Sequence, residues 1–143
     1  MAALQTFCRR SLLISAGLLV AVALVVAAVV IPQVRIEASR GGTPDMTVTA
    51  FWLNVGFTLL SALALFLSAI RSEAANWDSR PLLFIVGPVV LFLGFACIDA
   101  AAAYISHGPS MRTASVLLYI CGPVDFFVGI MAIVVAFLLL KKS

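Results

Sequence analysis

The chain has 143 residues, of which 64% are hydrophobic and 10% charged, and its mean hydropathy is +1.19. A soluble core of this size could not bury so much apolar surface, so the composition excludes a soluble domain and predicts an integral membrane protein. The formal charge of +3 comes from basic residues near the ends of apolar segments, where they orient a membrane protein and form no nucleic-acid-binding patch.

Four apolar segments are each long enough to cross a membrane, because a hydrocarbon core of about 30 Å needs about 20 helical residues. They are residues 12–31, 51–70, 82–105 and 116–140. The connections between them are too short to hold a separate soluble module. We therefore expect one transmembrane domain, residues 1–143, that is an all-α integral membrane protein built as a four-transmembrane-helix bundle.

The basic residues are distributed unevenly between the two ends of these segments. Six lie near the termini and the second connection: Arg9, Arg10, Arg71, Arg80, Lys141 and Lys142. Three lie in the first and third connections: Arg35, Arg40 and Arg112. Because cytoplasmic loops carry an excess of Lys and Arg, the pattern predicts that both termini face the cytoplasm.

The first segment has small residues at helical spacing, such as Gly17 and Ala21, which would let another helix approach closely. General alanine richness explains the same pattern. Pro32 is predicted to end this helix, since proline lacks the N–H that a continuing helix uses. The following RGGTPD sequence, residues 40–45, predicts a turn.

The second segment carries its polar residues on one face. The spacing of these residues on an ideal helix places them within a stripe less than about 90° wide: Asn54, Thr58, Ser61 and Ser68. We expect this face to contact protein, because an amide that faces lipid would be unpaired. Hydrogen bonding between helices explains the stripe better than a ligand site or pore lining does.

The third and fourth segments repeat one phrase. Residues 82–95 read LLFIVGPVVLFLGF and residues 117–130 read LLYICGPVDFFVGI, which agree at eight of 14 positions with an offset of 35 residues. Because consecutive spans cross a membrane in opposite directions, helices three and four are a possible inverted repeat.

Both copies of the repeat place glycines at a period of seven residues: Gly87 and Gly94 in the first, Gly122 and Gly129 in the second. This stripe predicts close left-handed packing of the two helices against each other. Each copy also has one proline, Pro88 or Pro123, which frees a carbonyl group one turn earlier and predicts a kink. An unwound segment that coordinates an ion is the alternative interpretation.

Two aspartates, Asp99 and Asp125, lie within the last two segments, where a charge costs roughly 2.5–3.5 kcal/mol on insertion scales. Asp125 falls on the glycine stripe, so we expect it at the interface of helices three and four or against a partner. Asp99 points elsewhere, toward helix two or another subunit, and the two acids should not form a close pair.

These acids have two explanations. The functional one is proton or cation handling. The structural one is a carboxyl group that stays neutral, or that is hydrogen-bonded to Asn54, Ser61 or a basic group of a neighbouring protein.

Residues for other chemistry are few. Cys8, Cys97 and Cys121 form no CxxC motif, and buried free thiols are favoured over a Cys97–Cys121 pair. His107 is the one histidine, so no metal site or cofactor is expected. No nucleophile–base–acid set is evident, and an enzyme is the weakest functional class.

The sequence favours a small accessory or assembly subunit, or a scaffold, that acts through helix packing within a larger complex or homo-oligomer. Its expected partners are the lipid bilayer and other membrane protein subunits or itself, with no nucleic acid. The alternative is a minimal ion- or proton-coupled transporter or channel that works as a dimer, with the Gly-Pro repeats and the acids as its pathway.

Overall fold

The computed structural model describes residues 2–71 and 80–142, and their regular structure is entirely helical. The elements in chain order are α1 (Ala2–Val25), the π-helical turn η1 (Val26–Val30), α2 (Ile31–Ser39), α3 (Met46–Arg71), α4 (Arg80–Tyr104), the 3₁₀ turns η2 (Ile105–His107) and η3 (Pro109–Met111), and α5 (Arg112–Lys142). Four stretches are long and apolar enough to cross a membrane: Thr6–Ser39, Met46–Ile70, Pro81–His107 and Arg112–Leu138.

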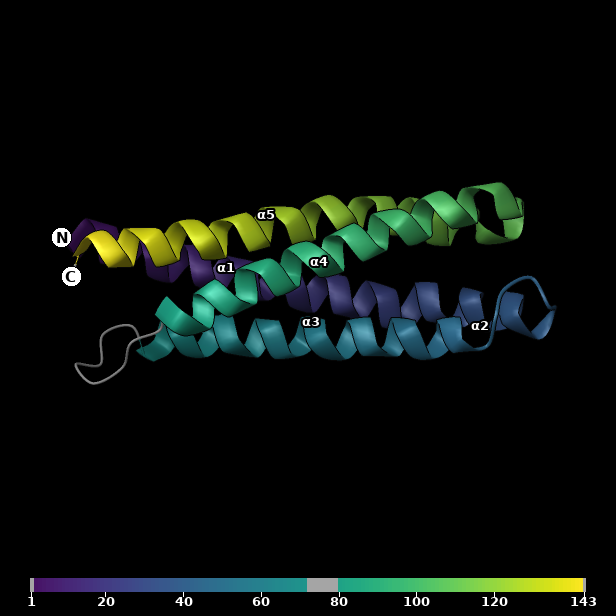
Figure 1. Cartoon of the computed structure of the whole chain (residues 1–143), viewed down its shortest axis with the longest axis horizontal. Coiled ribbons are helices and arrows are strands. Elements are labelled where there is room, and N and C mark those ends of the chain that lie inside the picture. Colours follow the sequence, from purple (N-terminus) through teal and green to yellow (C-terminus); the bar gives the residue numbers. More distant parts are fainter. Residues whose placement is uncertain (1, 72–79, 143) are drawn as a thin grey trace.

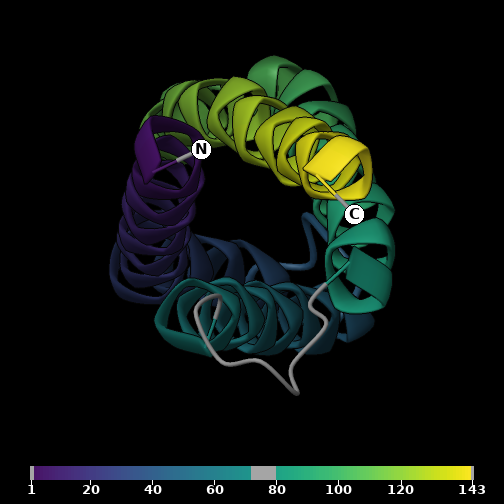
Figure 2. The ribbon, with the colours of Figure 1, turned by 90° about the vertical axis from the view of Figure 1, so that its left-hand side faces the viewer.

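The helices form a four-helix bundle, which confirms the predicted fold class of a multi-pass all-α membrane protein. Each helix packs beside its neighbours in sequence, and α5 closes the ring against α1, as the end-on view in Figure 2 shows. Both termini lie at one end of the bundle, called here the terminal end (Figure 1). The α2–α3 and α4–α5 turns lie at the opposite end, called the loop end.

The bundle is apolar inside and outside. Its core consists of two buried clusters, one that includes Val26, Val55 and Leu118 and one that includes Leu19, Leu65 and Val135. Large apolar side chains also cover the exterior, with Phe92 71% exposed and Phe95 63% exposed. Water would disfavour such a surface, whereas lipid tails accept it.

The first helix does not end at Pro32, so that prediction is wrong. The chain stays helical to Ser39, because a wide π turn, η1, directly precedes the proline. In this turn the N–H of Ile31 donates to the carbonyl of Val26, five residues earlier. In a regular α-helix, a proline ring clashes with the carbonyl group four residues earlier, and the wider π turn relieves this clash. The predicted turn at residues 40–45 does lie between α2 and α3.

The helical extension beyond Pro32 brings Gln33 to the start of α5. The Oε1 of Gln33 accepts a hydrogen bond of 3.0 Å from the backbone N–H of Ala114. This N–H lies in the first turn of α5, where helical N–H groups have no partner within the helix. Nearby, the Thr43 and Tyr104 hydroxyl oxygens lie 3.4 Å apart, so polar contacts join the two turns of the loop end.

The most extensive helix contact in the bundle joins α4 and α5, and glycines form its centre. A Cβ placed on Gly94 would lie 2.8 Å from the carbonyl oxygen of Gly122, and a Cβ on Gly129 would lie 2.9 Å from that of Gly87. Because real Cβ atoms do not approach this closely, the two backbones touch only where side chains are absent.

One further contact extends this register toward the loop end. The Ser115 hydroxyl donates a 2.8 Å hydrogen bond to the carbonyl of Ala101, seven residues beyond Gly94 on one helix and seven before Gly122 on the other. The α4–α5 hairpin then closes at Gly108, whose φ of 94° lies in a region that L side chains avoid.

The repeated phrase corresponds to a symmetric set of contacts. Gly87 lies against the side chain of Ile133, and Gly122 lies against the side chain of Ile98. Gly122 and Ile133 follow Gly87 and Ile98 by 35 residues, the offset of the sequence repeat. Exchanging the two copies thus exchanges the two contacts, as an inverted repeat with a two-fold axis across the hairpin requires.

Replacing Gly129 with Leu should destabilise the bundle by about 1–3 kcal/mol, because the added side chain would overlap the Gly87 carbonyl and Leu91. Gly56→Leu is the matched control, since no atom lies within 4 Å of the position of its Cβ. Thermal unfolding in detergent measures both variants. Equal melting temperatures for the two would contradict the glycine contact.

Candidate functional site

The polar face of α3 points into the bundle. Thr58, Ser61 and Ser68 are buried, at 0%, 5% and 0% exposure, and Asn54 is partly buried. The Ser68 oxygen has no hydrogen-bond partner among the described residues. The stripe thus contacts protein at the positions that its helical spacing suggests.

Two of these groups and two groups of other helices form a cluster, called here the polar cluster: Thr58 and Asn54 of α3, Cys97 of α4 and Asp125 of α5. The Thr58 hydroxyl donates to the backbone carbonyl of Asn54 at 2.7 Å. The Asn54 amide nitrogen contacts the Cys97 sulfur at 3.9 Å, and this thiol faces Oδ2 of Asp125 at 4.0 Å. Both sulfur contacts are long, so the cluster joins α3 to the hairpin through weak polar contacts.

Asp125 lies near the middle of the membrane span. It follows Arg112 by 13 residues and precedes Lys141 by 16, which places it about 20 Å and 24 Å from these basic ends along the helix. Its side chain is fully buried, and Oδ1 has no hydrogen-bond partner among the residues that the structure describes. Its Cβ packs on Gly94, which has no side chain to keep it away.

Asp99 occupies a different environment. It is exposed on the outer surface of α4, within the Pro81–His107 span. It makes no hydrogen bond or ion pair with any residue whose placement is described. The exposed residues within one turn of it on this face are apolar: Phe95, Ala102 and Ala103.

The α4–α5 register separates the two acids in depth as well. Asp99 precedes Ala101 by two residues, so it lies opposite Leu117, two residues after Ser115. Leu117 is eight residues from Asp125, or about 12 Å along the axis. The two acids are not one site: the first faces outward near the loop end, and the second is enclosed at mid-depth.

Pro88 and Pro123 lie within the continuous helices α4 and α5, and both are exposed. They are related by the 35-residue repeat. Neither is next to the carboxyl group of Asp125 on the inner face. The helices therefore continue through both prolines without an unwound segment.

The three cysteines are buried and free. Cys97 takes part in the polar cluster, a role that sequence analysis did not assign to it. One indication of its inward position is present in the sequence. Cys97 lies four residues before Ala101 on α4, so it shares the inner face of the helix with the small residues of the hairpin. Gln33 was also missed, because it was expected in a loop.

The polar cluster can do two things chemically. It can help to fix the position of α3 against the α4–α5 hairpin through the Asn54–Cys97 contact, which at 3.9 Å is a weak one. It can also hold a proton at the carboxyl group of Asp125, the one acidic group among its four members.

No family model, curated protein or solved structure matches this chain. The assignment of a function therefore depends on the chain's own residues and their contacts.

Proposed function

We propose that this protein is a small assembly subunit or scaffold of the membrane, which acts through helix packing within a larger complex or homo-oligomer. The observation that supports this proposal is the outward position of Asp99 on α4. Among the described residues, no other charged side chain lies on the face around it. This face is the surface that we propose contacts a partner.

The physical argument is the free energy of a carboxyl group in lipid. Asp99 lies about 12 Å along the axis from Asp125, which is near the middle of the span, so it lies just inside the edge of a hydrocarbon core of about 30 Å. An unpaired carboxylate is disfavoured there, by up to roughly 2.5–3.5 kcal/mol at full depth. A basic group or hydrogen-bond donor on a neighbouring helix would remove this penalty. The small residues Ala102 and Ala103, three and four positions on, allow such a helix to approach closely.

Asp125 supports the same proposal by contrast. Its side chain is fully buried, and its Cβ fills the space beside Gly94. A neutral carboxyl group in that position acts as a packing element of the bundle. The inner acid thus has a structural explanation within the chain, whereas the outer acid has no partner among the described residues.

We propose in addition that both termini face the cytoplasm, on the basis of the six-to-three distribution of basic residues. Both termini lie at one end of the bundle, so they face the same side of the membrane in either orientation. A glycosylation acceptor inserted at residues 40–45 should be modified on the non-cytoplasmic side, while one after Lys141 should not. Modification of only the acceptor after Lys141 would show that the protein has the opposite orientation.

Asp99→Asn and Asp125→Asn form a matched pair that tests the assembly proposal. Asp99→Asn removes the charge from the outer face and should weaken association at least tenfold, since loss of one member of a buried charged pair costs about 2–5 kcal/mol. Asp125→Asn keeps the shape of an enclosed side chain and should change association by less than about 1 kcal/mol.

The measurement is the mass of particles purified in mild detergent as a function of protein concentration. Circular dichroism and thermal unfolding control for the fold of each variant. A wild-type protein that remains monomeric and brings down no stoichiometric partner would contradict the proposal. Equal effects of the two substitutions would also contradict it.

A minimal ion- or proton-coupled transporter is the second candidate, and the observation that favours it is the unpartnered Oδ1 of Asp125 near mid-depth. In that case wild-type protein reconstituted alone in vesicles should conduct protons or cations, and Asp125→Asn should abolish the flux without unfolding. Robust flux of this kind would defeat the assembly proposal.

A further inference from the structure

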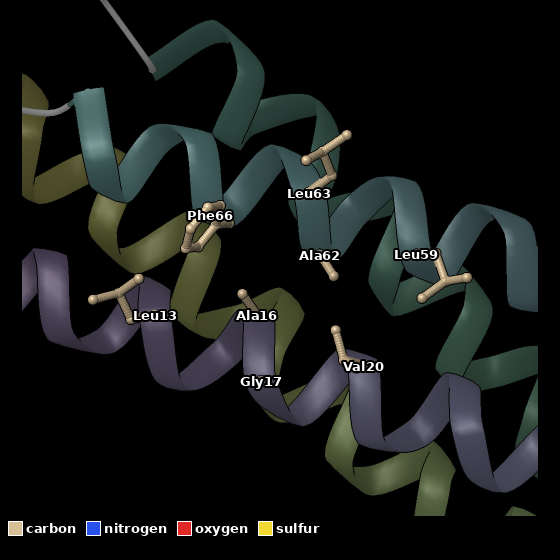
Figure 3. Close-up of a pocket in the computed structure, with 8 residues that line it drawn as sticks. All are labelled: Leu13, Ala16, Gly17, Val20, Leu59, Ala62, Leu63 and Phe66. Atoms are coloured by element: carbon tan, nitrogen blue, oxygen red, sulfur yellow. The ribbon is translucent and has the colours of Figure 1, made fainter.

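An apolar groove lies between α1 and α3, on the outside of the bundle toward the terminal end. Its volume is about 440 Å³, and it is open on its outer side. Figure 3 shows the side chains that line it, with Leu13, Ala16 and Val20 of α1 directed toward α3 and with Phe66, Ala62 and Leu59 on the opposite side. Its large walls are open to the outside, since Leu13, Val20 and Phe66 are 37%, 40% and 45% exposed.

The groove exists because its floor lacks large side chains. Ala16 and Ala62 are buried between the two helices, at 6% and 4% exposure. Gly17 lies beside them, and no atom lies within 4 Å of the position that its Cβ would take. The chain itself thus leaves this space unfilled, and an empty apolar recess loses the dispersion contacts of its walls. In a membrane, something apolar must occupy it.

The dimensions of the groove favour a flexible hydrocarbon chain over a helix. From Leu13 to Val20 it runs only about 10 Å along α1. A second helix that packed on Gly17 would need small neighbours one and two turns away in both directions. Only Ala21, one turn later and also exposed, meets this need. Elsewhere such a helix would meet Leu13, Val20 and the exposed Leu24, which is 62% exposed. A methylene chain is narrow enough to lie between these side chains.

The end of the groove indicates which kind of chain it holds. Arg10 precedes Leu13 by three residues and Gly17 by seven, so the three share one face of α1. Arg10 is exposed and lines a second hollow together with Thr6, Phe7 and Ser11. It lies 25 residues before Arg35, a separation of about 37 Å that places both arginines just outside a hydrocarbon core of about 30 Å.

We propose that this groove binds one acyl chain of an anionic phospholipid whose phosphate group pairs with Arg10. The guanidinium group presents several N–H donors in a planar fork that suits phosphate oxygens. The acyl chain then descends from the headgroup layer past Leu13 and lies over Gly17. The positive charge of Arg10 and the unfilled groove below it together favour one ligand, a lipid with a negatively charged headgroup.

Native mass spectrometry in mild detergent tests this proposal with two probes of identical acyl chains, palmitoyl-oleoyl phosphatidylglycerol and palmitoyl-oleoyl phosphatidylcholine. Wild-type protein should retain one phosphatidylglycerol molecule in preference to phosphatidylcholine. Gly17→Leu fills the groove and should abolish this binding event, and Gly17→Ala should weaken it. Gly56→Leu is the matched control, because it adds the same side chain at an open position one turn beyond Leu59.

The headgroup contact has its own pair of variants. Arg10→Gln should reduce the affinity for phosphatidylglycerol about fivefold, the equivalent of about 1 kcal/mol per basic side chain near an anionic lipid surface. The affinity for phosphatidylcholine should fall less, because its choline group already offsets the charge of its phosphate. Arg112→Gln, at the loop end, should change neither. Equal lipid retention by Gly17→Leu and Gly56→Leu would overturn the proposal. So would a change from dimer to monomer in Gly17→Leu, because the groove would then hold a second copy of this chain.

Discussion

The direct contact of the α4 and α5 backbones at their glycines is the constraint on which the rest of the bundle depends. It sets the depth of every residue on the hairpin, because the Gly94–Gly122 and Gly87–Gly129 contacts permit one register. That register places Ser115 against the Ala101 carbonyl and aligns the first turn of α5 with Gln33. It also leaves room beside Gly94 for the Cβ of Asp125, so an acid can be enclosed without separating the helices.

The inverted repeat is symmetric in its contacts but not in its chemistry. The position that Asp125 occupies in the second copy is Val90 in the first, and Cys97 corresponds to Ala132. All four are buried, so the replaced residues lie inside the bundle in both copies. In each pair only one residue is polar, Asp125 or Cys97, and these two residues meet on the side of the bundle that Asn54 occupies. The symmetry therefore supplies the packing, and the departures from it supply the polar cluster.

Sequence periodicity predicted the features that depend on a single helix. The seven-residue glycine period and the polar face of α3 follow from helical spacing alone, and so does the separation of Asp99 from Asp125. Features that depend on two helices were missed. Pro32 stays within a helix because a π turn precedes it and Gln33 beyond it caps α5. Cys97 looked like an apolar core residue, since only the fold brings Asn54 and Asp125 to its two sides.

The register of the α4–α5 hairpin is the central claim, and cross-linking measures it most directly. In protein with its three native cysteines replaced by alanine, Ala101→Cys with Ser115→Cys should form a disulfide on mild oxidation, because the Ser115 side chain already contacts the backbone of residue 101. Ala103→Cys with Ser115→Cys should not, since Ala103 lies at a similar depth on the exposed face of α4. Peptide mass spectrometry detects the linkage. Equal cross-linking of the two pairs, or linkage of the second pair alone, would contradict the glycine-centred hairpin.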